Sequence, residues 1–163
     1  MSQHLLATMI TTTTFGTWLP GDLRGYVDDG IILPGNPALL AHAKAMIKGA
    51  AVYLSRDEQA AALDGLIAGA SEFQYRLIAA SIESWHVHFL IDHGFDSVAV
   101  MVGRLKTRMR QAIRSTRIWT AGYDSRYCFE EREVQNRWAY INRHAGSRKL
   151  PPPHGNVPPT SFR

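Results

Sequence analysis

The stretch Ser-Trp-His-Val-His-Phe-Leu-Ile-Asp, residues 84–92, constrains the fold most, because its apolar residues recur at every second position. Side chains of a β-strand point alternately to opposite faces, so the spacing predicts a strand with one apolar face. That face would carry Trp85, Val87, Phe89 and Ile91. His86 and His88 would then lie side by side on the other face. Two neighbouring imidazoles can converge on one ion or one phosphate, although two exposed histidines on a half-buried strand remain the alternative.

Two further strands are expected from β-branched and apolar runs. The first covers Leu5 to Phe15 and would lie centrally in a sheet. The second covers Tyr75 to Ile82, and only Glu83 and Ser84 separate it from the histidine strand. Such a short connection predicts an antiparallel hairpin. The segment Ile118 to Glu130 is expected to be an irregular link or a short strand.

Four helices are predicted from capping residues and from apolar residues at helical spacing. They cover Pro37 to Lys48, Ser55 to about Ala70, Ser97 to about Thr116, and Glu131 to His144. The strands and helices together indicate one α+β domain in a chain of 163 residues. Residues 147–163 are rich in proline and predict an extended arm without a core of its own.

The composition of the chain limits which class of protein it can be and which partners it can bind. A formal net charge of +4 and a pI near 9.5 favour a polyanionic partner. Cys128 is the single cysteine, which rules out an internal disulfide and a cysteine-rich zinc site. There is no apolar run of the roughly 20 residues that a membrane span needs, so a cytoplasmic protein without a membrane partner is expected.

The most basic segment is the predicted helix after Ser97. It carries Arg104, Lys106, Arg108, Arg110, Arg114 and Arg117, with no acidic residue between Ser97 and Thr120. Like charges on one helix repel one another, so binding of a nucleic-acid backbone is favoured over a merely solvated face. Trp18 and Arg24, in the glycine-rich loop of residues 16–30, are candidates for stacking on bases and contacting phosphate. The alternative for this loop is that its aromatic rings pin it to the core.

Tyr140 and His144 lie four residues apart on the last predicted helix, and therefore on one flank of it. Three imidazoles, from His86, His88 and His144, suit a divalent transition metal that polarises a phosphoryl oxygen. Tyrosine attack on a phosphodiester would break a DNA strand and conserve the bond energy in a phosphotyrosine. The alternative for Tyr140 is an amphipathic tyrosine packed near the helix surface.

The residues at this point resemble a known family. Residues 85–91, Trp-His-Val-His-Phe-Leu-Ile, are similar to the His-hydrophobe-His motif of the single-tyrosine HUH transposases. These are the insertion-sequence 200/605 type and the related REP-associated tyrosine transposases. Three other segments also resemble this group: residues 14–25 its opening, residues 103–106 the start of its basic helix, and residues 139–146 its tyrosine helix.

The resemblance implies a ferredoxin-like α+β sandwich, with the histidine strand central in an antiparallel sheet and helices on one face. It implies a transposase catalytic domain over residues 1–146 that cuts and rejoins single-stranded DNA beside a DNA hairpin. A divalent metal, Mg²⁺ or Mn²⁺, would be held by His86 and His88, and Tyr140 would be the nucleophile that forms a 5′-phosphotyrosine. A homodimer is also implied.

The chain departs from the family pattern at one ligand position. The family often has Gln or Asn four residues after the tyrosine, whereas this chain has His144. The competing interpretation is a domesticated protein that grips hairpin DNA without cutting it. The intact His86, His88 and Tyr140 favour the enzyme, because a pure binder has no need of them. A third class, the His-x-His-x-His hydrolases, is excluded because Leu90 occupies the third position.

Overall fold

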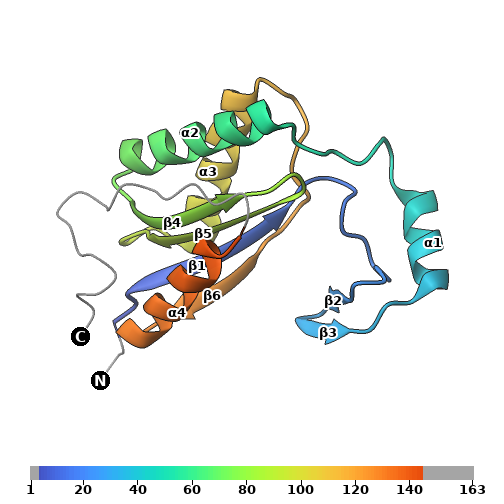
Figure 1. Ribbon diagram of the computed structural model, residues 1–163, viewed down its shortest axis with the longest axis horizontal. Helices are drawn as coiled ribbons and strands as arrows, with labels where there is room; N and C mark the ends of the chain where they lie inside the picture. Colours follow the sequence, from blue (N-terminus) through green and yellow to red (C-terminus); the bar gives the residue numbers. More distant parts are fainter. Residues whose placement is uncertain (1–3, 145–163) are drawn as a thin grey trace.

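The computed structural model describes residues 4–144, and a four-stranded antiparallel sheet forms its centre (Figure 1). The strands are β1 (Ala7–Thr13), β4 (Arg76–Ile82), β5 (His86–Asp92) and β6 (Asp124–Cys128). Their spatial order is β4-β5-β1-β6, and every neighbouring pair is antiparallel. One helix that packs on the sheet lies between β1 and β4 and another between β5 and β6, which is the ferredoxin-like β-α-β-β-α-β arrangement with a further helix and a hairpin inserted after β1. The expected fold class is confirmed.

Two helices, α2 (Arg56–Glu72) and α3 (Val98–Ile113), cover one face of the sheet (Figure 1). Both begin at a predicted cap, because Ser55 and Ser97 accept hydrogen bonds from backbone N–H groups three residues later. Their apolar stripes pack on the side chains that point from the sheet to this face. The strand residues at the centre of this core are Ile10, Val87, Phe89 and Ile91.

The last helix, α4 (Glu131–Asn142), lies on the opposite face of the sheet, whereas all the helices were expected on one face (Figure 1). The physical reason is that β1 and β5 are apolar on both sides. Met9 and Leu90 point away from α2 and α3, and Val134 and Ile141 of α4 bury them in a second core. α4 therefore packs on the face that also carries His86 and His88.

Between β1 and α2 the chain makes an excursion that lies to one side of the sheet (Figure 1). It contains the hairpin β2 (Tyr26–Asp28) and β3 (Ile31–Leu33) and the helix α1 (Pro37–Met46), which Asn36 caps as predicted. The hairpin was expected to be loop. Its turn is Asp29-Gly30, and both residues have positive φ, 48° and 77°, as a two-residue type I′ turn requires.

Three further expectations can be compared with the structure. The segment 118–130 contains a strand, β6, which pairs with β1 at the edge of the sheet. Trp85 was expected on the apolar core face of the strand. In the structure β5 begins at His86, so Trp85 lies just outside the strand, and its carbonyl accepts a hydrogen bond from the Thr14 N–H. The proline-rich arm predicted at residues 147–163 lies outside the described residues. Within residues 4–144, every helix is too short or too polar to span a bilayer.

Candidate metal and tyrosine site

The site lies where α4 crosses the sheet face that carries the two histidines of β5. His86 and His88 are two residues apart on the strand, and their ring centroids are 4.8 Å apart. His144 follows directly after α4, with its ring centroid 5.7 Å from that of His86 and 4.7 Å from that of His88. The three residues each offer a ligand atom, and these atoms all lie within 4.8 Å of one another. Residues 58 positions apart in the chain thus form one cluster.

Tyr140 completes the cluster from the flank of α4. Its ring centroid lies 5.5 Å from that of His88 and 5.0 Å from that of His144. The side chain is 42% exposed, so its phenol is accessible to a large substrate. The packed residues Val134 and Ile141 hold α4 in this orientation. Two other tyrosines lie elsewhere, since Tyr75 donates to Asp96 and Tyr127 packs near Phe129.

Burial keeps the two strand histidines neutral. It lowers the pKa of His86 to about 4, with the neighbouring His144 adding to the effect. It lowers the pKa of His88 to about 3, and the two other imidazoles add to this. Because a metal binds only the neutral imidazole, both side chains are available as ligands at neutral pH.

One hydrogen bond orients the His88 ring. The Nδ1 atom of His88 lies 2.8 Å from the hydroxyl oxygen of Thr11, which stands directly opposite it on β1. An Nδ1–H that donates to Thr11 leaves the Nε2 lone pair free for an ion, which is the usual outer-shell arrangement of a ligating histidine. Sequence analysis missed Thr11, because only the strand register places it against His88.

The residues present fit a divalent metal ion. The Nδ1 atom of His86 is buried and has no hydrogen-bond partner among the described residues, so a polar atom is left for a ligand to satisfy. Imidazole is a ligand that divalent transition ions accept more readily than Mg²⁺, which prefers oxygen ligands.

The loop that carries Trp18 and Arg24 lies beside this cluster. Arg24 donates to both carboxylate oxygens of Asp22 and to the Thr17 carbonyl, and its guanidinium stacks 4.4 Å from the Trp85 ring centroid. The Trp18 indole N–H donates to the Gly25 carbonyl. The Trp18 ring also lies edge-on to Trp85, with 5.9 Å between the centroids, so Trp18 and Arg24 attach the loop to the residue that precedes β5. A role of Trp18 and Arg24 in binding DNA stays a prediction.

The basic side chains of α3 lie on the far side of the sheet from the histidines, and the expectation of unopposed charge there is wrong. Arg104 pairs with Asp96 at 2.6 Å, and Arg108 makes two hydrogen bonds to Glu72 of α2, at 2.6 and 2.7 Å. The counter-charges come from Asp96, just before the helix, and from Glu72 of α2, which is why the absence of acidic residues within α3 itself did not indicate them.

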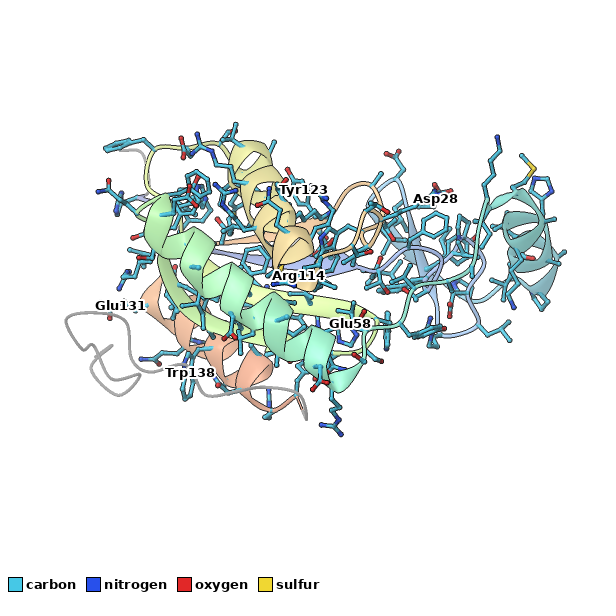
Figure 2. The ribbon with its side chains drawn as sticks, turned by 90° about the horizontal axis from the view of Figure 1, so that it is seen from above. Asp28, Glu58, Arg114, Tyr123, Glu131 and Trp138 are labelled. Atoms are coloured by element: carbon cyan, nitrogen blue, oxygen red, sulfur yellow. The ribbon has the colours of Figure 1, made fainter. Side chains whose placement is uncertain are left out.

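The remaining basic residues of α3 lie toward its C-terminal half. Lys106 donates to the carbonyls of Thr120 and Gly122, and burial lowers the pKa of its ammonium. Arg110 donates to the Ser115 carbonyl. Arg114, which Figure 2 labels, caps the C-terminal end of α3. Its backbone has a left-handed conformation. Binding of DNA by these residues, and by Arg104 and Arg108, stays a prediction.

Comparison with known proteins agrees with the fold. No family model matches the chain, and no curated protein matches it in sequence. Among solved structures, it is similar to a REP-associated tyrosine transposase bound to a REP hairpin. The TM-score is 0.52 and the sequence identity 10%, over 86% of this chain and 68% of that one. The chain shares its ferredoxin-like fold with this transposase.

Proposed function

We propose that this protein is a transposase-type endonuclease and strand transferase of single-stranded DNA, related to the REP-associated tyrosine transposases. Tyr140 would be its nucleophile, and a divalent metal at His86, His88 and His144 its cofactor. The observation that carries the proposal is the convergence of these four side chains, from β5 and α4, on one sheet face. A protein that only grips DNA has no need of a phenol beside three imidazoles.

The proposed reaction begins with the Tyr140 oxygen, which attacks the phosphorus of a phosphodiester. The bond from phosphorus to the 3′ oxygen breaks, and a 5′-phosphotyrosine forms. The phenol proton ends on the leaving 3′ oxygen by way of solvent, which reaches the partly exposed side chain. A metal at the three imidazoles would polarise the phosphoryl oxygen as a Lewis acid. Attack of a free 3′-hydroxyl on the phosphotyrosine reverses the step and joins a strand without ATP.

The DNA substrate is proposed on the likeness to a structure bound to a DNA hairpin. The homodimer stays a prediction. Since one chain brings the three imidazoles and the phenol together, a partner copy need not lend its tyrosine to the site. The alternative is a protein that binds hairpin DNA without cutting it. The experiment below distinguishes this binding protein from the nuclease.

The test is a cleavage assay on a single strand that carries a hairpin, with Mn²⁺ and a denaturing gel. We expect the native chain to form a covalent adduct with the 3′ part of the strand, through the 5′ phosphate of that fragment, and to release the 5′ part with a free 3′-hydroxyl. Tyr140→Phe should abolish the adduct and strand cleavage, because the phenol oxygen forms the new bond, and should leave hairpin binding unchanged.

The matched control is Tyr127→Phe, which removes an exposed phenol from β6 away from the cluster. It should form the adduct at the native rate. An adduct with Tyr140→Phe would assign the nucleophile to another tyrosine. Hairpin binding by the native chain without any cleavage in Mn²⁺ or Mg²⁺ would establish the binding protein instead.

A further inference from the structure

A cleft of about 440 Å³ opens beside the candidate site. One wall is formed by β1 and the segment that leads into β6, and the other by the loop of residues 18–20 and the β2–β3 hairpin. Its lining residues are Thr11, Thr12, Thr13, Trp18, Leu19, Pro20, Tyr26, Val27, Gly30, Ala121, Gly122, Tyr123 and Asp124. Its volume lies within the range of about 300–1,000 Å³ that small-ligand sites occupy.

The cleft is separated from the histidine cluster by residues of β1 that contact both. Thr11 lines it and also makes the hydrogen bond to His88. Thr13, another lining residue, pairs with His86 across the strands. Neighbouring strands are about 4.7–4.9 Å apart, so the cleft begins one strand away from the imidazoles. A strand of DNA whose phosphate lies at the cluster therefore has its next nucleotide within reach of the cleft.

The lining suits a nucleobase better than a phosphate. Among the residues that the structure describes, Asp124 is the only charged one in the lining, its carboxylate pairs with Arg126 at 3.0 Å, and the lining offers no cation to a phosphate. Three aromatic rings line it, of which Trp18 is held by its bond to Gly25 and Tyr123 is 40% exposed. Unpaired bases bind to proteins chiefly by stacking on such rings.

Positive charge lies at the rim of the cleft. The Lys106 ammonium lies 2.6 Å from the Gly122 carbonyl, on one wall. Arg24 lies against Trp85, but its charge is paired with Asp22, so Lys106 is the cation that this arrangement offers. This arrangement suits a base that is inserted between the walls while its sugar-phosphate backbone stays outside.

We propose that this cleft binds one unpaired base of the single-stranded DNA, next to the phosphate at the histidine cluster, and that Tyr123 stacks on it. The inference rests on the proposed function for the identity of the strand. It assigns to the β2–β3 excursion a role as the outer wall of a base-binding site.

The experiment measures binding of a 12-nucleotide oligo-dT that contains one 2-aminopurine, in EDTA so that no cleavage occurs. Stacking in the cleft should quench the 2-aminopurine fluorescence. Tyr123→Ala should weaken binding roughly tenfold and remove the quenching, and Tyr123→Phe should restore both, because the ring and not the hydroxyl stacks. Tyr127→Ala is the matched control, since it removes an exposed tyrosine outside the cleft.

A second probe with abasic sites in place of its bases separates stacking from general binding. The native chain and Tyr123→Ala should bind this strand equally. Native affinity and quenching in Tyr123→Ala, with an unchanged circular dichroism melting curve, would overturn the cleft proposal. Because these measurements need no metal and no Tyr140, quenching that persists in a chain without cleavage activity would refute the nuclease and leave the base site standing.

Discussion

The smallest feature on which the candidate site depends is the hydrogen bond between Thr11 and His88. It joins two central strands and lies inside the protein, where His88 is only 6% exposed. A buried ring without such a partner can turn about its χ angles and present either nitrogen. Thr11 therefore acts as a positioning residue, which determines whether His88 offers its Nε2 atom to an ion.

Thr11→Val tests this role, because it keeps the shape of the side chain and removes the hydroxyl. We expect Mn²⁺ affinity, followed by electron paramagnetic resonance of the free ion, to fall roughly 10–100-fold, as for other outer-shell partners of ligating histidines. Thr11→Ser should restore it. Thr13→Val, two residues along the same strand face, removes a hydroxyl that bonds to Thr120 instead and serves as control. Equal Mn²⁺ affinity in all four proteins would refute the positioning role.

For single residues, the sequence predicts which side chains belong to the site better than it predicts the contacts that they make. His86 and His88 follow from strand alternation, and Tyr140 and His144 from helical spacing. Thr11 and Tyr123 do not, because their places depend on which strands pair and in what register. The same limit explains the ion pair of Arg108 with Glu72, which joins two helices that are distant in sequence.

Among the elements, helices α2 and α3 pack tightly on each other at Gly65. A Cβ atom added to Gly65 of α2 would lie 2.8 Å from the Ala112 Cβ and 2.8 Å from the Arg108 carbonyl oxygen of α3. The second of these is backbone, which cannot move away without displacing the helix. Gly65 is thus what lets the two helices pack tightly over the sheet.

Gly65→Ala should lower the free energy of unfolding by about 1–3 kcal/mol, because the helices must separate to admit the methyl group. Gly103→Ala on α3 is the matched control, since nothing lies within 4 Å of its added Cβ. There alanine should raise the free energy of unfolding by up to about 1 kcal/mol through helix propensity alone. Urea unfolding of both variants measures the difference. If Gly65→Ala raised the free energy of unfolding, the two helices would have room for the methyl group and the contact would not be tight.

The elements themselves were largely predictable, and the exceptions have physical causes. Caps at Asn36, Ser55 and Ser97 are local, so the starts of three helices follow from sequence. The short β2–β3 hairpin was missed although Asp29-Gly30 is a typical turn pair, because the surrounding glycines and Pro20 favoured a loop. The position of α4 on the opposite face was missed because it depends on a second apolar side of the sheet. The alternation of apolar residues in a single strand does not reveal that side.

For the molecule as a whole, the buried histidines link stability to pH. Burial holds the pKa values of His86 and His88 at about 4 and about 3 in the folded state, below the ordinary value of 6.5. As pH falls through about 6.5, the unfolded chain takes up protons that the folded chain does not. The unfolded state is thereby favoured, so stability declines from about pH 6.5 down toward the folded pKa values and is fully retained above 6.5.

In EDTA, the free energy of unfolding should therefore fall between pH 6.5 and pH 5, by up to about 1.4 kcal/mol per pH unit for each histidine. The lowered carboxyl pKa values of Asp22, Glu72 and Glu133 affect stability only at lower pH, because unfolded carboxyls titrate near 4. Urea unfolding at three pH values measures the slope. The double variant His86→Asn, His88→Asn should flatten it, while His42→Asn, on the exposed helix α1, should leave it as in the native chain. An unchanged slope in the double variant would show that these two imidazoles are not held neutral by the fold, and so are not ready to bind a metal at neutral pH.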